Sequence, residues 1–333
     1  MNSPAFTPVL LLTGFLGSGK TTLLARLIDD GSSSDVAVLI NEFGEVALDH
    51  RLVGQIDDTT IVLKSGCLCC TLNGDLADAV EKLHGRRARG EIPFFRRLVI
   101  ETTGLADPSP ILATFRNHPV LRHHFEVVSV VATLDAVLGA ETLRRHAESR
   151  KQVAVADWLL ISKTDIASRE AQDAVTAAAR GNNPAAEIVS SRDIEPARLF
   201  EPWWPRHMSR AFSCTETTPA SEHPHLDSIR TTAVHLAEDS DWSTFGLWLT
   251  ALLHARGHEI LRVKAILDLS GVEGKVVVHG VQNIVHPPVH LAESGTDLPA
   301  SQAVFIHHGD LGSAIIRSLK AFGIKVNEST SRS

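Results

Sequence analysis

Short, almost continuously apolar runs alternate with segments of helical periodicity over the N-terminal part of the chain. Such runs are typical of strands in a parallel sheet, which helices cover on both faces. The alternation therefore predicts an α/β fold with a doubly wound, mostly parallel sheet. The predicted strands are 8–13, 35–40, 59–64, 97–100, 126–134, 157–161 and 188–190. The predicted helices are 23–28, 72–83, 144–156 and 167–179, with a basic loop at 85–90.

The pattern changes after the last of these strands. Prolines, adjacent tryptophans and serine- and threonine-rich stretches fill residues 201–224, as in an interdomain connection. Beyond it we predict strands at 229–236, 259–269, 275–280 and 303–307 and helices at 242–254 and 311–322. We predict a larger α/β domain at 1–205 and a smaller α/β domain at 227–326. A linker at 206–226 joins them, and a disordered tail follows at 327–333.

Composition narrows the class of protein. The 333 residues are 44% hydrophobic and 21% charged, which is typical of a globular chain. The net charge of −7 argues against general binding to nucleic acid, because that function needs clustered positive charge. No stretch reaches the length of a membrane span and no signal peptide is recognisable, so we expect a soluble, cytoplasmic protein without a membrane partner.

The sequence GFLGSGKTT at 14–22 stands between the first predicted strand and the first predicted helix, and it fits the pattern G-x-x-x-x-G-K-[ST]. Glycines in such a loop bring backbone N–H groups close to phosphate oxygens, and the helix N-terminus favours negative charge. Lys20 would reach the β- and γ-phosphates, and the Thr21 hydroxyl would hold Mg²⁺. The residues assigned to nucleotide binding here are Gly14, Gly17, Ser18, Gly19, Lys20, Thr21 and Thr22. The alternative is a glycine-rich turn with a chance lysine.

Acidic residues follow two other predicted strands. Glu42 and Glu45 come after the second strand, and Glu101 and Gly104 come after the fourth. In P-loop proteins an acidic residue at such a strand end meets Mg²⁺, and a glycine beyond it lets the backbone approach the γ-phosphate. We therefore assign Glu101 to Mg²⁺, and Glu42 and Glu45 to metal coordination or to positioning water. The alternative for the last two is a pair of solvated loop charges.

Three of the four cysteines crowd into Cys67, Cys69 and Cys70. This spacing argues against a disulfide framework and for metal or thiol chemistry in a reducing compartment. Thiolates prefer Zn²⁺ and similar ions, but the adjacent Cys69 and Cys70 point in different directions. We therefore expect a carboxylate, a histidine or water to complete a tetrahedral site. The alternatives are three small buried hydrophobic residues and a reversible thiol-redox role.

A Lys-x-Asp turn, Lys163 and Asp165, follows the predicted strand 157–161. An aspartate there accepts hydrogen bonds from the N1–H and the exocyclic amine of guanine, and adenine lacks this pair of donors. Lys163 would lie along the base and the ribose. Lys-x-Asp alone is a common turn, but its place after the glycine loop and the acidic strand favours a guanine nucleotide.

The order GFLGSGKTT, NEFGE, GCLCC, ETTGLADP and SKTD, followed by a second α/β domain, closely resembles the CobW family of P-loop GTPases over nearly the whole chain. Members of that family act as metallochaperones or as activators of metalloenzymes. The resemblance implies a site for Zn²⁺ or a similar divalent ion at the cysteines, a Mg²⁺ site at Thr21 and Glu101, and a C-terminal domain that modulates or recognises a client metalloprotein.

The chain departs from the family pattern in two places. Ser162 stands where the family usually has asparagine, which predicts a softer preference for guanine. The histidine-rich run that often precedes the second domain shrinks to His223 and His225, which weakens a role in metal transfer there.

Together these observations predict a slow GTPase that converts GTP to GDP and phosphate, with Lys20, Glu101 and Glu45 as its catalytic residues. Nucleotide state is expected to control the binding and delivery of a divalent transition metal, and zinc is the first choice of metal. The reason is that the γ-phosphate and Mg²⁺ would order the adjoining loops. Two alternatives stay open: a passive zinc buffer with an incidental GTPase, and an ATP-preferring P-loop NTPase or kinase. An oligomer is compatible with the sequence.

Overall fold

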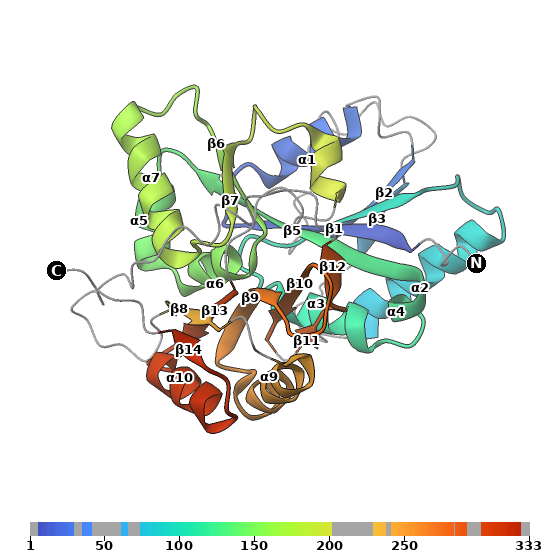
Figure 1. Ribbon diagram of the computed structural model, residues 1–333. Coiled ribbons are helices and arrows are strands. Elements are labelled where there is room, and N and C mark those ends of the chain that lie inside the picture. The colour runs from blue at the N-terminus through green and yellow to red at the C-terminus, as the bar shows by residue number, and fades with distance from the viewer. Residues whose placement is uncertain are drawn as a thin grey trace. The chain divides into compact units, whose positions relative to one another are not determined.

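The computed structural model describes residues 6–29, 35–41, 61–65, 74–201, 229–237, 241–282, 284–291 and 301–327 (Figure 1). The chain forms two compact units. The first comprises Met1–Ala178 and Ile188–Trp203, and the second comprises Ala179–Glu187 and Trp204–Ser333.

The first unit is built on a seven-stranded sheet in the order β3-β2-β4-β1-β5-β6-β7. Its strands are β1 (Thr7–Gly14), β2 (Val36–Asn41), β3 (Ile61–Ser65), β4 (Arg97–Glu101), β5 (Phe125–Asp135), β6 (Trp158–Ser162) and β7 (Glu187–Ser190). All pairings from β3 through β6 are parallel. Residues 9–12 of the central strand β1 are fully buried, as its unbroken apolar run predicts. The doubly wound parallel sheet predicted from the sequence is confirmed.

Helices pack on both faces of this sheet, with α1 on one face and α3 and α4 on the other (Figure 1). The helices are α1 (Lys20–Asp29), α2 (Gly74–Ala88), α3 (Ser109–Asn117), α4 (Leu121–His124), α5 (Gly139–Arg145), α6 (Ala147–Val155) and α7 (Arg169–Asn182), followed by the 3₁₀ helix η1 (Pro196–Phe200). Among the described residues, no helix is both long and apolar enough to cross a bilayer.

Two predicted elements differ from the structure. The basic loop predicted at 85–90 is helical as far as Ala88, because Arg87 is held by tertiary contacts. Its guanidinium donates to Thr7 Oγ1 (3.0 Å) and to the Phe95 carbonyl (2.9 Å) and lies 4.3 Å from the centroid of the Phe95 ring. The helix predicted at 144–156 is two helices, because His146 is extended (φ −114°, ψ 118°) between α5 and α6.

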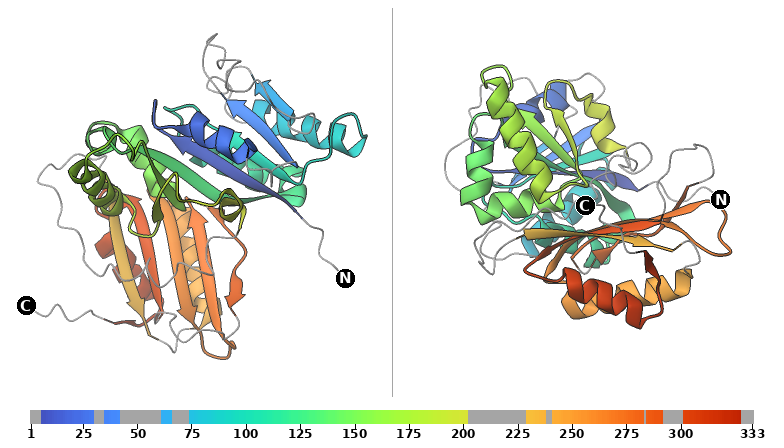
Figure 2. Two further views of the ribbon diagram at one scale, coloured as in Figure 1. Left: turned by 90° about the horizontal axis from the view of Figure 1, so that it is seen from above. Right: turned by 60° about the vertical axis from the view of Figure 1, so that its left-hand side comes forward.

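The second unit carries an antiparallel sheet in the order β11-β10-β9-β13-β8-β14, with β12 paired to β10 (Figure 2). Its strands are β8 (Ile229–Leu236), β9 (Ile260–Asp268), β10 (Lys275–Val281), β11 (Ile284–Val285), β12 (Val289–Leu291), β13 (Gln302–His308) and β14 (Val326–Asn327). The helices α9 (Trp242–Arg256) and α10 (Gly312–Ala321) supply Phe245, Trp248, Ile315 and Leu319 to its core. The predicted smaller α/β domain is therefore present, whereas the predicted linker and residues 328–333 lie outside the described residues.

Candidate nucleotide-binding site

The loop between β1 and α1 has the backbone that its glycines predict. Gly14, Gly17 and Gly19 have positive φ values of 137°, 71° and 95°, a conformation that a residue with a Cβ rarely adopts. Gly14 is also required for steric reasons, because a Cβ at this position would lie 2.7 Å from the Thr133 carbonyl oxygen. Ser18 is buried, and its Oγ lies 2.6 Å from Thr133 Oγ1 of β5. The loop is thus fixed against β5, and the Ser18 N–H closes a turn on the Phe15 carbonyl (3.1 Å) just before the N-terminus of α1, where an anion is favoured.

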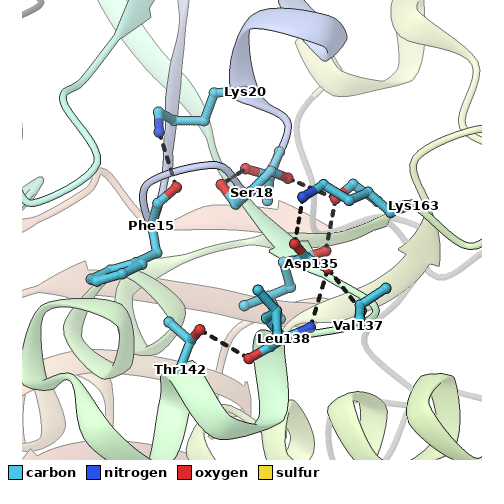
Figure 3. A network of polar contacts seen from close by, with 11 residues as sticks. Phe15, Ser18, Lys20, Asp135, Val137, Leu138, Thr142 and Lys163 are labelled. Atoms are coloured by element: carbon cyan, nitrogen blue, oxygen red, sulfur yellow. Dashed lines mark hydrogen bonds and ion pairs between the residues drawn. The ribbon is translucent and has the colours of Figure 1, made fainter. Parts of the chain in front are cut away.

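Lys20, the first residue of α1, reaches back across this loop. Its ammonium group donates to the Gly14 carbonyl (2.9 Å) and to the Phe15 carbonyl (3.2 Å), as Figure 3 shows for Phe15. The residue is only 8% exposed. A positive charge is therefore held beside the N-terminus of a helix, where both favour phosphate.

Oxygen donors lie close to the start of α1. The Thr21 hydroxyl donates to Glu101 Oε1 at 3.3 Å, and Glu101, at the end of β4, is 6% exposed. In the parallel register of β1 and β4, Glu101 pairs with Leu12, which places its carboxylate near the start of α1 and within reach of Thr21. A hydroxyl and a carboxylate are ligands that Mg²⁺ prefers, so this donor set fits that ion. Thr22, in the same turn, is exposed.

The segment after β4 lies directly against the glycine loop. Thr102 donates through its amide to the Leu12 carbonyl (2.9 Å) and through its hydroxyl to Thr13 Oγ1 (2.9 Å). At Gly104 a Cβ would lie 2.6 Å from the Leu16 nitrogen, so only glycine allows this approach of the two backbones. The structure therefore brings Gly104 against the glycine loop, which is the predicted phosphate-binding loop. The approach of Gly104 to the γ-phosphate stays a prediction.

The turn after β6 is joined to the same loop by Ser162. Its hydroxyl is within hydrogen-bonding distance of the Ser18 carbonyl (2.7 Å) and the Leu134 carbonyl (3.2 Å). In place of asparagine, this serine is predicted to remove an amide that supports the base and the loop. The structure shows that the hydroxyl still connects the turn to the phosphate-binding loop.

Lys163 adopts a left-handed backbone (φ 56°), and its ammonium group donates to Asp135 Oδ2 at 2.6 Å (Figure 3). Asp135 Oδ1 accepts from the amides of Val137 (2.7 Å) and Leu138 (3.2 Å). Burial alone would raise the pKa of Asp135, but the hydrogen bonds from Lys163 and the two amides outweigh it and hold this pKa below its ordinary value. Asp135 therefore stays ionised and fixes Lys163 in the turn after β6, the predicted base-binding turn, by a contact that could not be foreseen from the sequence.

Asp165 is paired with Arg192, a residue that the sequence analysis also missed. The Arg192 guanidinium lies 2.9 Å from Asp165 Oδ2, and both side chains are substantially exposed. Arg26 of α1 donates to the carbonyls of Ser191 and Arg192, which ties the turn after β7 to α1. The signal available in the sequence was a basic residue just after the last predicted strand of the sheet.

Seven predicted residues lie outside the described residues, namely Glu42, Glu45, Cys67, Cys69, Cys70, His223 and His225. The strands that precede the first five end at the same edge as Glu101. Asn41, the last residue of β2, pairs with Ser65, the last of β3, and Ile40 pairs with Glu101. Within the described ranges, no three His, Cys, Asp or Glu residues are grouped so that they could hold a metal.

A parallel sheet with this glycine loop, a lysine reaching across it and an acidic residue on the neighbouring strand defines a P-loop nucleotide-binding protein. The comparison with protein families is more specific. Residues 8–190 match the nucleotide-binding domain of the CobW/HypB/UreG family, and residues 229–322 match the cobalamin synthesis protein cobW C-terminal domain. The chain belongs to this family, which confirms the resemblance found in its motifs.

Relatives in this family cover nearly the whole chain. The zinc chaperone YjiA of Escherichia coli (strain K12) is 34% identical over 306 residues, which cover 90% of this chain and 93% of that protein. The zinc chaperone CobW of Pseudomonas aeruginosa is 29% identical, over 84% of this chain and 82% of that protein. The crystal structure of Zn(II)-bound YjiA GTPase from E. coli matches with a TM-score of 0.68 and 30% identity, over 97% of this chain and 99% of the other.

A second crystal structure gives a similar match. It is a Zn(II)-bound YjiA GTPase variant in which one glutamate and two cysteines are replaced by alanine, with a TM-score of 0.69, 30% identity and the same coverage.

Proposed function

We propose that this protein is a GTP-hydrolysing zinc chaperone whose nucleotide state controls how tightly it holds the metal. The observation that carries the proposal is the edge shared by β1, β2, β3 and β4. There the Thr21–Glu101 pair lies beside the loop crossed by Lys20. The strands β2 and β3 end at this edge, and in the sequence they are followed by the two glutamates and by the three cysteines. The relatives named as zinc chaperones also support a function in handling zinc.

The phosphates of the nucleotide are proposed to bind the amides of residues 14–22. Lys20 contacts the β- and γ-phosphates and, with the loop amides, stabilises negative charge on the transferring phosphoryl group. Thr21 and Glu101 hold Mg²⁺, which when bound neutralises charge on the phosphate oxygens. Glu45, outside the described residues, remains our proposal for positioning the attacking water, with Glu42 as a metal ligand.

The base is proposed to be guanine. Asp165 accepts its two donors, and Lys163 lies along the ring with its backbone fixed by Asp135. In the structure, Asp165 Oδ2 is paired with Arg192, so the guanidinium competes with the base for this carboxylate. Because adenine lacks the two donors that Asp165 accepts, we propose that GTP is preferred to ATP, although the chain has Ser162 in place of the family's asparagine.

Replacing Arg192 with alanine should raise the affinity for GDP by about two- to fivefold, because exposed ion pairs are worth at most about 1 kcal/mol. The measurement is titration with a fluorescent GDP derivative at low and at physiological salt, and the difference between wild type and variant should shrink as salt screens the pair. Arg169→Ala, an exposed arginine of α7, is the control. A lower affinity for GDP in the Arg192 variant would mean that this residue supports the base and does not compete with it.

Zinc is proposed to bind the thiolates of Cys67, Cys69 and Cys70, with a carboxylate, histidine or water completing the site. Binding of GTP orders the segments that follow β2 and β3, and hydrolysis relaxes them, which releases the metal to a client metalloprotein. The second unit is the proposed surface for that client. A passive zinc buffer would bind the metal equally in every nucleotide state.

Zinc affinity should therefore depend on the nucleotide. We expect the dissociation constant for Zn²⁺, measured by competition with a chromophoric chelator, to differ by at least about tenfold between protein with a non-hydrolysable GTP analogue and protein with GDP. Cys69→Ala should abolish this difference, whereas Cys214→Ala, a change in the one cysteine outside the cluster, should preserve it. Equal zinc affinities with the analogue, with GDP and without nucleotide would refute the coupling, and this comparison is informative even where zinc also binds elsewhere on the surface.

A further inference from the structure

Two glutamines make the same kind of contact at opposite ends of the nucleotide site. The side-chain amide of Gln152, on α6, donates to the carbonyls of Gly104 and Ala106, both at 3.1 Å. The side-chain amide of Gln172, on α7, donates to the carbonyls of Thr164 (3.0 Å) and Ala167 (3.1 Å). Each side chain thus bridges two carbonyls of one loop. Gln152 holds the loop that follows Glu101, and Gln172 holds the loop that carries Asp165.

The position of Gln152 is costly without these bonds. The residue is 1% exposed and is followed on α6 by the buried Val153, Ala154 and Val155. Its Oε1 atom is buried and has no hydrogen-bond partner in the part of the chain that the structure describes. Burying an amide in apolar surroundings is unfavourable unless its groups are paired. The two bonds to the loop therefore fix both the glutamine and the loop.

The loop that Gln152 holds is the one that lies on the phosphate-binding loop. A Cβ at Gly104 would come within 2.6 Å of the Leu16 nitrogen and 2.8 Å of its Cα, so the Gly104 peptide is in direct backbone contact with that loop. The same helix adds an ion pair between Lys151 and Asp107 (3.8 Å). Just before α6, the centroid of the His146 ring lies 4.5 Å from the centroid of the Phe15 ring in the phosphate-binding loop. The helix α6 and the residue that caps it, His146, therefore contact both loops at the phosphate end of the site.

We propose that Gln152 is a positioning residue for the γ-phosphate. Its side-chain amide keeps the Gly104 peptide against the phosphate-binding loop, where the terminal phosphate of GTP would lie, and it makes no contact with the nucleotide itself. This inference rests on the proposed function. Because GDP lacks that phosphate, Gln152 acts on the affinity for GTP and leaves the affinity for GDP unchanged. Gln172 holds the base end, which GTP and GDP share, so it acts on both affinities alike.

The test compares Gln152→Met with Gln172→Met, since methionine keeps the unbranched shape and removes the donors. Dissociation constants are measured with fluorescent derivatives of GDP and of the slowly hydrolysed analogue GTPγS, in the presence of Mg²⁺. We expect Gln152→Met to weaken GTPγS about tenfold, the effect of losing two ordinary hydrogen bonds, and to change GDP less than about twofold. Gln172→Met should weaken both nucleotides by the same factor.

A second variant guards against misfolding at this buried position. Gln152→Asn keeps the amide but shortens the side chain by one methylene, so it can no longer bridge both carbonyls, and it should shift the ratio of the two affinities in the same direction. An unchanged ratio in both Gln152 variants would reduce the residue to a structural role and overturn the inference. A gain in GTPγS affinity would also overturn it, because the bridge would then hold an inactive loop. Wild-type protein that binds neither nucleotide would instead defeat the proposed function.

Discussion

Replacing Lys20 with alanine should lower the rate of GTP turnover by at least a hundredfold, the effect typical of removing one group that stabilises charge on the transferring phosphoryl. The ammonium group is nearly buried and is fixed by the Gly14 and Phe15 carbonyls, so it is already placed when the phosphates arrive. Water entering the space would not reproduce a fixed positive charge. The measurement is release of inorganic phosphate at saturating GTP, with nucleotide affinity determined separately.

Lys82→Ala provides a matched control, since that lysine is exposed on α2, outside the site. Thermal unfolding of both variants should show that the fold is intact. If Lys20→Ala hydrolysed GTP within about threefold of wild type while remaining folded, the glycine loop would not be the phosphate site, and the assignment of Thr21 and Glu101 to Mg²⁺ would lose its basis.

The phosphate end of the site could be predicted because its signals are local. A strand, a glycine loop and a helix follow one another within residues 7–29, and the loop conformation depends on glycines that are visible in the sequence. Glu101 could be predicted because parallel strands place their ends at one edge of the sheet, and its register with Leu12 confirms that reasoning.

The contacts that hold the site together could not be predicted in the same way. Asp135 and Lys163 are 28 positions apart, and Gln152 and Gly104 are 48 apart, so only the tertiary fold shows that they meet. A glutamine in the middle of a helix carries no local signal, because it is an ordinary helix former. Tertiary contacts of Arg87 likewise extended a helix where the sequence suggested a basic loop.

The outcome at Ser162 changes where specificity for the base should reside. The sequence predicts a softer guanine preference, because an amide that supports both the base and the loop is missing. The serine hydroxyl, however, connects the turn to the Ser18 carbonyl, so the phosphate-binding loop and the base-binding turn remain joined. In the proposed guanine site, the group left to discriminate between bases is the carboxylate of Asp165, so its replacement is the sharpest test of nucleotide identity.

Asp165→Asn should therefore lower the affinity for GTP by roughly a hundredfold or more and shift the preference to XTP. Xanthine carries a carbonyl where guanine has its exocyclic amine, so an asparagine amide can donate to that oxygen, whereas it opposes a donor when guanine binds. The Asp165 side chain is 42% exposed and its pair with Arg192 lies at the surface, so the substitution should leave the fold intact. Competition of GTP, XTP and ATP against a fluorescent nucleotide measures the change.

Asp193→Asn is the matched control, because that aspartate is exposed in the neighbouring turn after β7 and should leave the order GTP over XTP unchanged. Two results would contradict the reading of Asp165. Wild-type protein that prefers ATP would show that the carboxylate does not select guanine and would favour a kinase or an ATPase. An Asp165→Asn variant that still preferred GTP to XTP would place recognition of the base on backbone groups of the adjoining turns. Discrimination by the Asp165 carboxylate requires that wild-type protein prefers GTP to ATP and that Asp165→Asn prefers XTP to GTP. Both results are needed because, at the edge of the base that faces Asp165, the pair of donors distinguishes guanine from adenine and from xanthine.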